Sequence, residues 1–283
     1  MAISFNNPPK KLLTSLGGLL HLSWPWRITI GYLSIMLLLP MAALLWMSAT
    51  KDPSEFWRIA TSPVAISAYD VTFVTAFVTA LINGVFGTLI AWVLVRYDFP
   101  FKRIIDAAID LPFALPTAVA GLTIATVYSR TGWIGSLLEP FGIQIAFTRF
   151  GVGIAMLFIS LPFVVRTVQP VLREIEPEVE EVAWSLGASN SQTFWRIIIP
   201  QLISPILIGV ALGFSRAVGE YGSIVIVASN IPFKDLIAPV LIFQRLEQYD
   251  YYGATVIGVV LLAVSLAILF AINLVQAWGR RYA

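Results

Sequence analysis

The amino-acid sequence predicts an all-α integral membrane protein that crosses the bilayer six times. The chain of 283 residues is 58% apolar and only 12% charged, whereas a soluble domain has about 25% charged residues. A membrane-spanning helix needs roughly 20 mostly apolar residues. Six stretches meet this need: 28–47, 71–95, 104–128, 150–172, 201–228 and 253–277. Each should be helical, because a lone span must satisfy its own backbone hydrogen bonds in lipid.

Three of these stretches, at 28–47, 71–95 and 253–277, carry no charge. The other three combine charges with prolines: Asp106, Asp110, Pro112 and Pro116 in the third, Pro162 and Arg166 in the fourth, and Pro205, Arg216 and Glu220 in the fifth. The first span is too long for a cleaved signal peptide, whose apolar region has about 7–15 residues. We therefore expect it to remain as a helix.

The distribution of Lys and Arg predicts that both termini are cytoplasmic. With the N-terminus inside, the cytoplasmic segments hold eleven of these residues and the outer segments six, as the positive-inside rule requires. The predicted organisation is a cytoplasmic tail at 1–27, a first transmembrane helix at 28–48, a core of five transmembrane helices at 68–274, and a cytoplasmic C-terminus at 275–283.

Composition also excludes several kinds of site. The chain has no cysteine and a single histidine, His21, so neither a metal cluster nor a thiol nucleophile is available. We assign His21 to the membrane interface. The net charge of +2 points neither to nucleic acid nor to an acidic partner.

The segment 173–200, between the fourth and fifth spans, has the most specific pattern. Pro177 fits the first turn of a short helix, and Gly187 suits the left-handed residue that ends it. Ser189 and Gln192 have capping-box spacing and open a second short helix. The first helix carries an apolar face that must be buried, either against the chain's own bundle or in a groove of a cytoplasmic partner.

This segment resembles the coupling loop of permease subunits of bacterial ABC importers, known by its family pattern E-A-A-x3-G-x9-I-x-L-P. The matching positions are Glu181, Ala183, Gly187, Ile197 and Pro200. Val182 and Ile199 depart from the usual Ala and Leu, and both remain apolar. The resemblance implies the type I ABC importer permease architecture, in a multi-pass protein of the bacterial inner membrane.

The resemblance also implies roles and partners. Glu181 and Ala183 would face an ATPase subunit, Gly187 would form the turn, and Ile197 and Pro200 would anchor the loop to the fifth span. The chain lacks the G-x-x-x-x-G-K-[ST] loop that holds ATP phosphates. ATP and Mg would therefore be bound by two separate ATP-binding subunits, and this chain would contain neither a cofactor nor a catalytic residue.

Three further stretches, at 110–121, 160–170 and 215–222, are similar to permeases of the sulfate/thiosulfate and molybdate group. The first is similar to the T-type subunit of the sulfate/thiosulfate importer. That resemblance implies a second permease, the W type, in a heterodimer, and a periplasmic sulfate-binding protein. A molybdate/tungstate permease is the alternative within the same group.

Arg216 and Glu220 are four residues apart in the predicted fifth span, so they should share one face of a helix. Charges within a span usually face protein or water. Arg216 either lines the anion pathway or pairs with Glu220 and fixes packing. Gly209, Gly213 and Ala217 predict that a neighbouring helix approaches closely.

Asp106 and Asp110 are also four apart. They are expected to cap a helix break before Pro112 or to pair with Arg103, and Asp110 is a further candidate for the pathway. For Arg166 we expect a role in holding the loop or in reaching the lipid headgroups.

Two other classes of protein fit the sequence less well. A proton-coupled secondary transporter using Asp106, Asp110 and Glu220 would leave the 173–200 loop without a purpose. An intramembrane enzyme would lack a catalytic group. The sequence therefore predicts the membrane-spanning permease subunit of an ATP-driven sulfate/thiosulfate importer, which performs no bond chemistry itself.

Overall fold

The computed structural model describes residues 24–279, excluding the side chains of 273 and 275–279. His21 and most of the predicted tail at 1–27 therefore lie outside the described residues. The described residues fall into two compact units that divide between Thr50 and Lys51, and each is described by itself. Every regular element within 24–279 is helical. Five helices there are long and apolar enough to cross a membrane, which confirms an all-α membrane protein.

In the described part of the first unit, residues 24–50, the chain forms one helical run, Trp24–Ser48, which confirms the first predicted span. It consists of α1 (Trp24–Leu33), the π-helical turn η2 (Ser34–Leu38) and α2 (Leu39–Ser48). The π turn lies just before Pro40. Proline has no backbone N–H to donate to the preceding turn, and a local π turn is one way in which a helix accommodates that loss.

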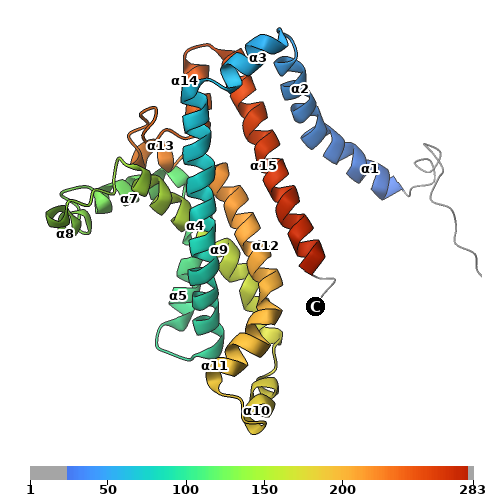
Figure 1. Cartoon of the computed structure of the whole chain (residues 1–283), viewed down its shortest axis with the longest axis vertical. Helices are drawn as coiled ribbons and strands as arrows, with labels where there is room; N and C mark the ends of the chain where they lie inside the picture. The colour runs from blue at the N-terminus through green and yellow to red at the C-terminus, as the bar shows by residue number, and fades with distance from the viewer. Residues whose placement is uncertain (1–23, 280–283) are drawn as a thin grey trace, which may run out of the picture. The chain divides into compact units, whose positions relative to one another are not determined.

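The second unit is built on three long helices that pack together (Figure 1): α4 (Pro63–Arg96), α9 (Arg149–Glu174) and α12 (Ile199–Val218). Small residues bring them close. A Cβ on Gly87 of α4 would lie 2.9 Å from the Val164 side chain, and one on Gly209 would lie 2.7 Å from the Val164 Cα. The predicted close approach at Gly209 and Gly213 is confirmed, since α9 packs against both.

Within this core, α4 and α9 are joined by a buried polar contact. The Asn83 side-chain amide donates to Ser160 Oγ at 2.8 Å and to the Leu157 carbonyl at 2.9 Å. A buried amide without partners would be costly in lipid. These bonds therefore fix how the two helices are rotated relative to one another.

The prediction of one continuous third span at 104–128 is wrong. The chain forms α5 (Lys102–Ile109), α6 (Leu111–Ala114) and α7 (Thr117–Tyr128). Leu115 is extended, with ψ 135°, because the residue before a proline avoids the helical region. Pro112 and Pro116 thus break the stretch. With 12 residues, α7 is about 18 Å long, shorter than the bilayer core.

The fifth predicted span is correct in its first part and wrong in its last. Helix α12 stops at Val218 and is capped by Gly219, and the chain turns before the short helix α13 (Ile224–Val227). Glu220 therefore lies beyond the helix. The predicted second, fourth and sixth spans are confirmed by α4, α9 and α15 (Tyr251–Gly279).

Short helices occupy the two ends of the second unit. At one end, α3 (Pro53–Ala60) and α14 (Ala238–Glu247) pack near the start of α15. The loop between α7 and α9 contains α8 (Gly135–Leu138) and the 3-10 turn η3 (Glu139–Phe141). At the opposite end lie α10 (Pro177–Ser185), α11 (Asn190–Thr193) and the π turn η4 (Phe194–Ile198), which precedes Pro200 as η2 precedes Pro40.

Candidate functional site

The 173–200 loop folds as predicted in its first part, where the short helix α10 ends in a tight turn, whereas the expected second short helix is the start of one continuous helical run, Asn190–Val218. Gly187 has φ +88° and ends α10. Its N–H donates to the Trp184 carbonyl at 2.9 Å, and the next N–H, of Ala188, donates to the Ala183 carbonyl at 3.0 Å. This pair of bonds is the Schellman motif. The Ser189–Gln192 capping box at the start of α11 is also confirmed.

The apolar face of α10 is not covered by the bundle. Ala183 is the one buried residue of this helix, while four large apolar side chains of the same segment are exposed: Val179, Val182, Trp184 and Leu186. Glu181 is exposed as well. The sequence left two possibilities for this face: packing against the chain's own bundle, or burial in a groove of a partner. The structure does not bury it against the bundle.

The two ends of the loop are anchored in an apolar cluster between the long helices. Ile175 precedes α10 and Ile198 follows α11, and both belong to the cluster that contains Leu94, Val168 and Leu202. Two positions that match the family pattern follow the turn at Gly187. Ile197 is half-buried, and Pro200 is exposed on the first turn of α12.

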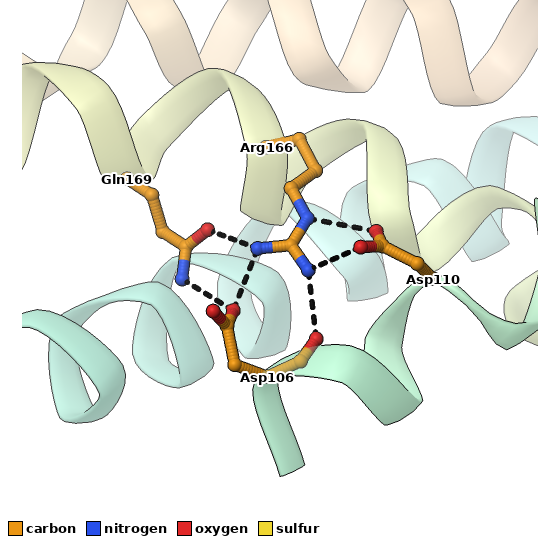
Figure 2. Close-up of polar contacts among 4 residues, drawn as sticks. All are labelled: Asp106, Asp110, Arg166 and Gln169. Carbon is orange, nitrogen blue, oxygen red and sulfur yellow. Dashed lines mark hydrogen bonds and ion pairs between the residues drawn. The ribbon is translucent and has the colours of Figure 1, made fainter. Parts of the chain in front are cut away.

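Arg166 on α9 is the centre of a polar cluster that ties α9 to the broken third stretch (Figure 2). Its Nε donates to Asp110 Oδ1 at 2.8 Å, and Nη2 donates to Asp110 Oδ2 at 2.7 Å. Nη1 donates to Asp106 Oδ1 and to Gln169 Oε1, both at 2.6 Å, and Nη2 also reaches the Asp106 carbonyl at 2.7 Å. A guanidinium has five N–H groups, and all five are engaged.

This cluster corrects three expectations. Asp106 and Asp110 pair with Arg166 and not with Arg103, and Asp110 makes no side-chain cap at α6. Arg166 holds α5 and the start of α6, not the loop or a lipid headgroup. Sequence reasoning missed the pairing because the partners are 56 and 60 residues apart. The available signal was the need of an intramembrane arginine for a carboxylate partner.

Arg216 is in the last turn of α12 and pairs with Glu220 across the helix end, at 2.6 Å. Glu220 is buried, and its other oxygen accepts from Ser223 N and Oγ, both at 2.9 Å. The predicted contact forms although Glu220 is outside the helix. Glu220 thereby fixes the turn that leads into α13.

The two intramembrane arginines differ in how many donors remain free. Arg166 uses all five N–H groups, and its cluster with two carboxylates carries one net negative charge. Arg216 makes one hydrogen bond among the described residues, to Glu220, and 31% of its side chain is exposed. Arg216 therefore keeps N–H groups with which it can bind a further anion.

Residues 83–281 match the family described as binding-protein-dependent transport system inner membrane component. The match covers well over half of the chain, so the chain belongs to this family of importer permeases. It is 66% identical over 275 residues to the protein named sulfate transport system permease protein CysT of Synechocystis sp., which covers 97% of this chain and 96% of that relative. The protein of the same name in Synechococcus elongatus is 63% identical over 93% of this chain and 95% of the relative.

A protein named probable sulfate transport system permease protein cysT in Marchantia polymorpha is 51% identical over 89% of this chain and 87% of its own length. Among solved structures, a bacterial ABC transporter that imports alginate has a TM-score of 0.72 at 20% identity, over 89% of this chain and 92% of that one. At this identity the likeness concerns the fold alone, and it confirms the predicted ABC importer permease architecture.

Proposed function

We propose that this chain is the membrane-spanning permease subunit of an ATP-driven importer of sulfate and thiosulfate, and that it forms half of the translocation pathway. The observation that carries the proposal is the 66% identity, over nearly the whole chain, to a relative named as a sulfate permease. Membership of the binding-protein-dependent family supports an ATPase and a substrate-binding protein as partners.

The uncovered face of α10 supports a docking role for the 173–200 loop. Val182 and Leu186 are exposed on a helix outside the core, and such a face is stabilised when a partner buries it. We assign the groove that receives it to one of two ATP-binding subunits, with Glu181 at the contact. ATP and Mg would be held there, and this chain would hydrolyse nothing itself.

The remaining partners and the location are part of the same proposal. The second permease is a W-type subunit in a heterodimer, and a periplasmic sulfate-binding protein delivers the anion. The complex would lie in the bacterial inner membrane, with loop 173–200 in the cytoplasm. The hydrogen bonds of Asn83 and the close packing at the small residues of α4 hold the helices of this chain together. This half of the translocation pathway can therefore move as one rigid body.

Arg216 is the residue we assign to the anion pathway. Its free N–H groups suit a tetrahedral oxyanion, while Glu220 neutralises it enough to limit tight binding and to permit release. Asp110 would act indirectly, because Arg166 already holds its carboxylate. It shapes the pathway by fixing α6, and it does not contact the anion.

The test is anion uptake by the complex reconstituted in liposomes with its ATPase, second permease and binding protein. We expect ATP-dependent sulfate uptake that thiosulfate suppresses and molybdate does not. Suppression by molybdate or tungstate would instead assign the chain to the other branch of the group. Uptake driven by a proton gradient without ATP would overturn the proposal, as would full activity of this chain purified alone.

A further inference from the structure

One ion pair joins the middle of the 173–200 loop to a membrane helix. Arg96 is the last residue of α4, and its Nη2 lies 2.7 Å from Glu180 Oε1 on α10. The same nitrogen donates to the Ile175 carbonyl at 3.3 Å. Only 17% of the arginine side chain and 15% of the glutamate side chain are exposed. Solvent and salt therefore screen this pair less than a surface pair.

Apart from this pair, α10 is held loosely. Its single buried residue is Ala183, and in Figure 1 it lies beyond the ends of the long helices. The apolar anchors, Ile175 and Ile198, are at the two ends of the loop and not on α10. Among residues 24–272, no second ion pair connects this loop to another element. The rest of the loop also contacts α4, through Ile175, Ile198 and the Trp92–Phe194 ring pair, but the ion pair that joins α10 itself to α4 is Arg96–Glu180.

The helix at the other side of the pair is suited to carry a displacement. Helix α4 has 34 residues, and its single proline, Pro63, is at the start, so nothing interrupts about 51 Å of helix. Near its opposite end, Thr72 Oγ1 accepts from the Ala238 N–H of α14 at 2.8 Å. One rigid element thus links the coupling loop to α14 at the far end of the unit.

We propose that the Arg96–Glu180 ion pair is the polar contact through which α10 of the coupling loop moves α4. When the ATPase displaces α10, Glu180 would pull Arg96, and α4 would shift as a rod that carries α14 with it. Arg96 and Glu180 are positioning residues here and touch neither ATP nor the anion. The inference rests on the proposed function, since it requires an ATPase bound to α10.

The experiment compares charge reversals in the reconstituted complex: Arg96→Glu, Glu180→Arg and the double reversal. The readout is sulfate transported per ATP hydrolysed, with assembly measured by co-purification of the ATPase. We expect each single reversal to lower the ratio roughly tenfold, and the double reversal to restore it to within about threefold of the parent. The control is Lys102→Glu, which breaks the exposed Lys102–Asp98 pair near the same end of α4 and should leave the ratio unchanged.

Single reversals that match the control, or a double reversal as defective as the singles, would overturn the inference. Where a single reversal does not assemble, the double variant decides: an assembled and coupled complex supports the inference, and an unassembled one refutes it. A parent complex that transports a different oxyanion would contradict the proposed substrate only. The same ratio, measured with that anion, would still test the ion pair.

Discussion

Arg166 on α9 holds the carboxylate of Asp110 at two points, with Nε donating to Oδ1 at 2.8 Å and Nη2 donating to Oδ2 at 2.7 Å. Such a bidentate contact fixes both the distance and the orientation of its partners. It attaches the break between α5 and α6 to one of the three central helices. The geometry of the interrupted third stretch therefore depends on a residue far away in the sequence.

Arg166→Lys should destabilise the protein although it keeps the charge. A lysine ammonium has three donors at one point and cannot serve both carboxylates and Gln169 together. We expect a loss of about 1–3 kcal/mol in the free energy of unfolding, measured by thermal unfolding of the complex in detergent. The control is Arg130→Lys on the exposed loop, where the arginine donates to Gln144. Equal unfolding temperatures for the two variants would contradict the prediction.

The double variant Arg216→Met with Glu220→Gln tests the anion pathway without leaving a lone buried charge. The amide that replaces the Glu220 carboxylate keeps an oxygen that can accept from Ser223, so the turn into α13 should survive. If Arg216 attracts the anion, sulfate uptake per assembled complex should fall about tenfold, corresponding to about 1.4 kcal/mol. Uptake equal to that of the parent, at normal membrane abundance, would remove Arg216 from the pathway.

Gly187→Ala should weaken attachment of the ATPase. With φ +88° and no atom within 4 Å of an added Cβ, the substitution strains the backbone and causes no clash, at a cost of about 1 kcal/mol. Gly142→Ala is a matched control, because Gly142 has φ +71° in an equally open loop. We expect less co-purified ATPase with the Gly187 variant only. Equal loss in both variants would show that the turn has no special role.

Ser160→Cys combined with Gly213→Cys should form a disulfide between α9 and α12. A Cβ on Gly213 lies 3.4 Å from the Ser160 Cβ, close to the roughly 3.5–4.5 Å that disulfides require. The chain has no native cysteine, so loss of thiol labelling of this chain, measured after the oxidised membranes are denatured because Ser160 is buried, reports this pair alone. Each single-cysteine variant should stay fully labelled. Persistent labelling of the double variant would contradict the packing of these helices.

Much of the architecture could be predicted because it follows from local rules. The long apolar stretches become helices in lipid because no other form satisfies an isolated backbone. The turn at Gly187 and the capping box at Ser189 depend on residues within a few positions of one another. The same is true of the break at Pro116, because a proline keeps the residue before it out of the helical region, although the apolar stretch 104–128 predicts a single span.

The sequence by itself therefore determined that the chain lies in lipid, that its long apolar stretches are helical, and which loop identifies its family. The tertiary structure alone decided which charges meet: Arg166 with Asp106 and Asp110, and Arg96 with Glu180, 84 positions along the chain. An ion pair needs its partners within about 4 Å, and sequence spacing predicts that distance only within one helix or across its end, as for Arg216 and Glu220. Between helices it depends on packing, which here is governed by the small residues that bring α4, α9 and α12 together.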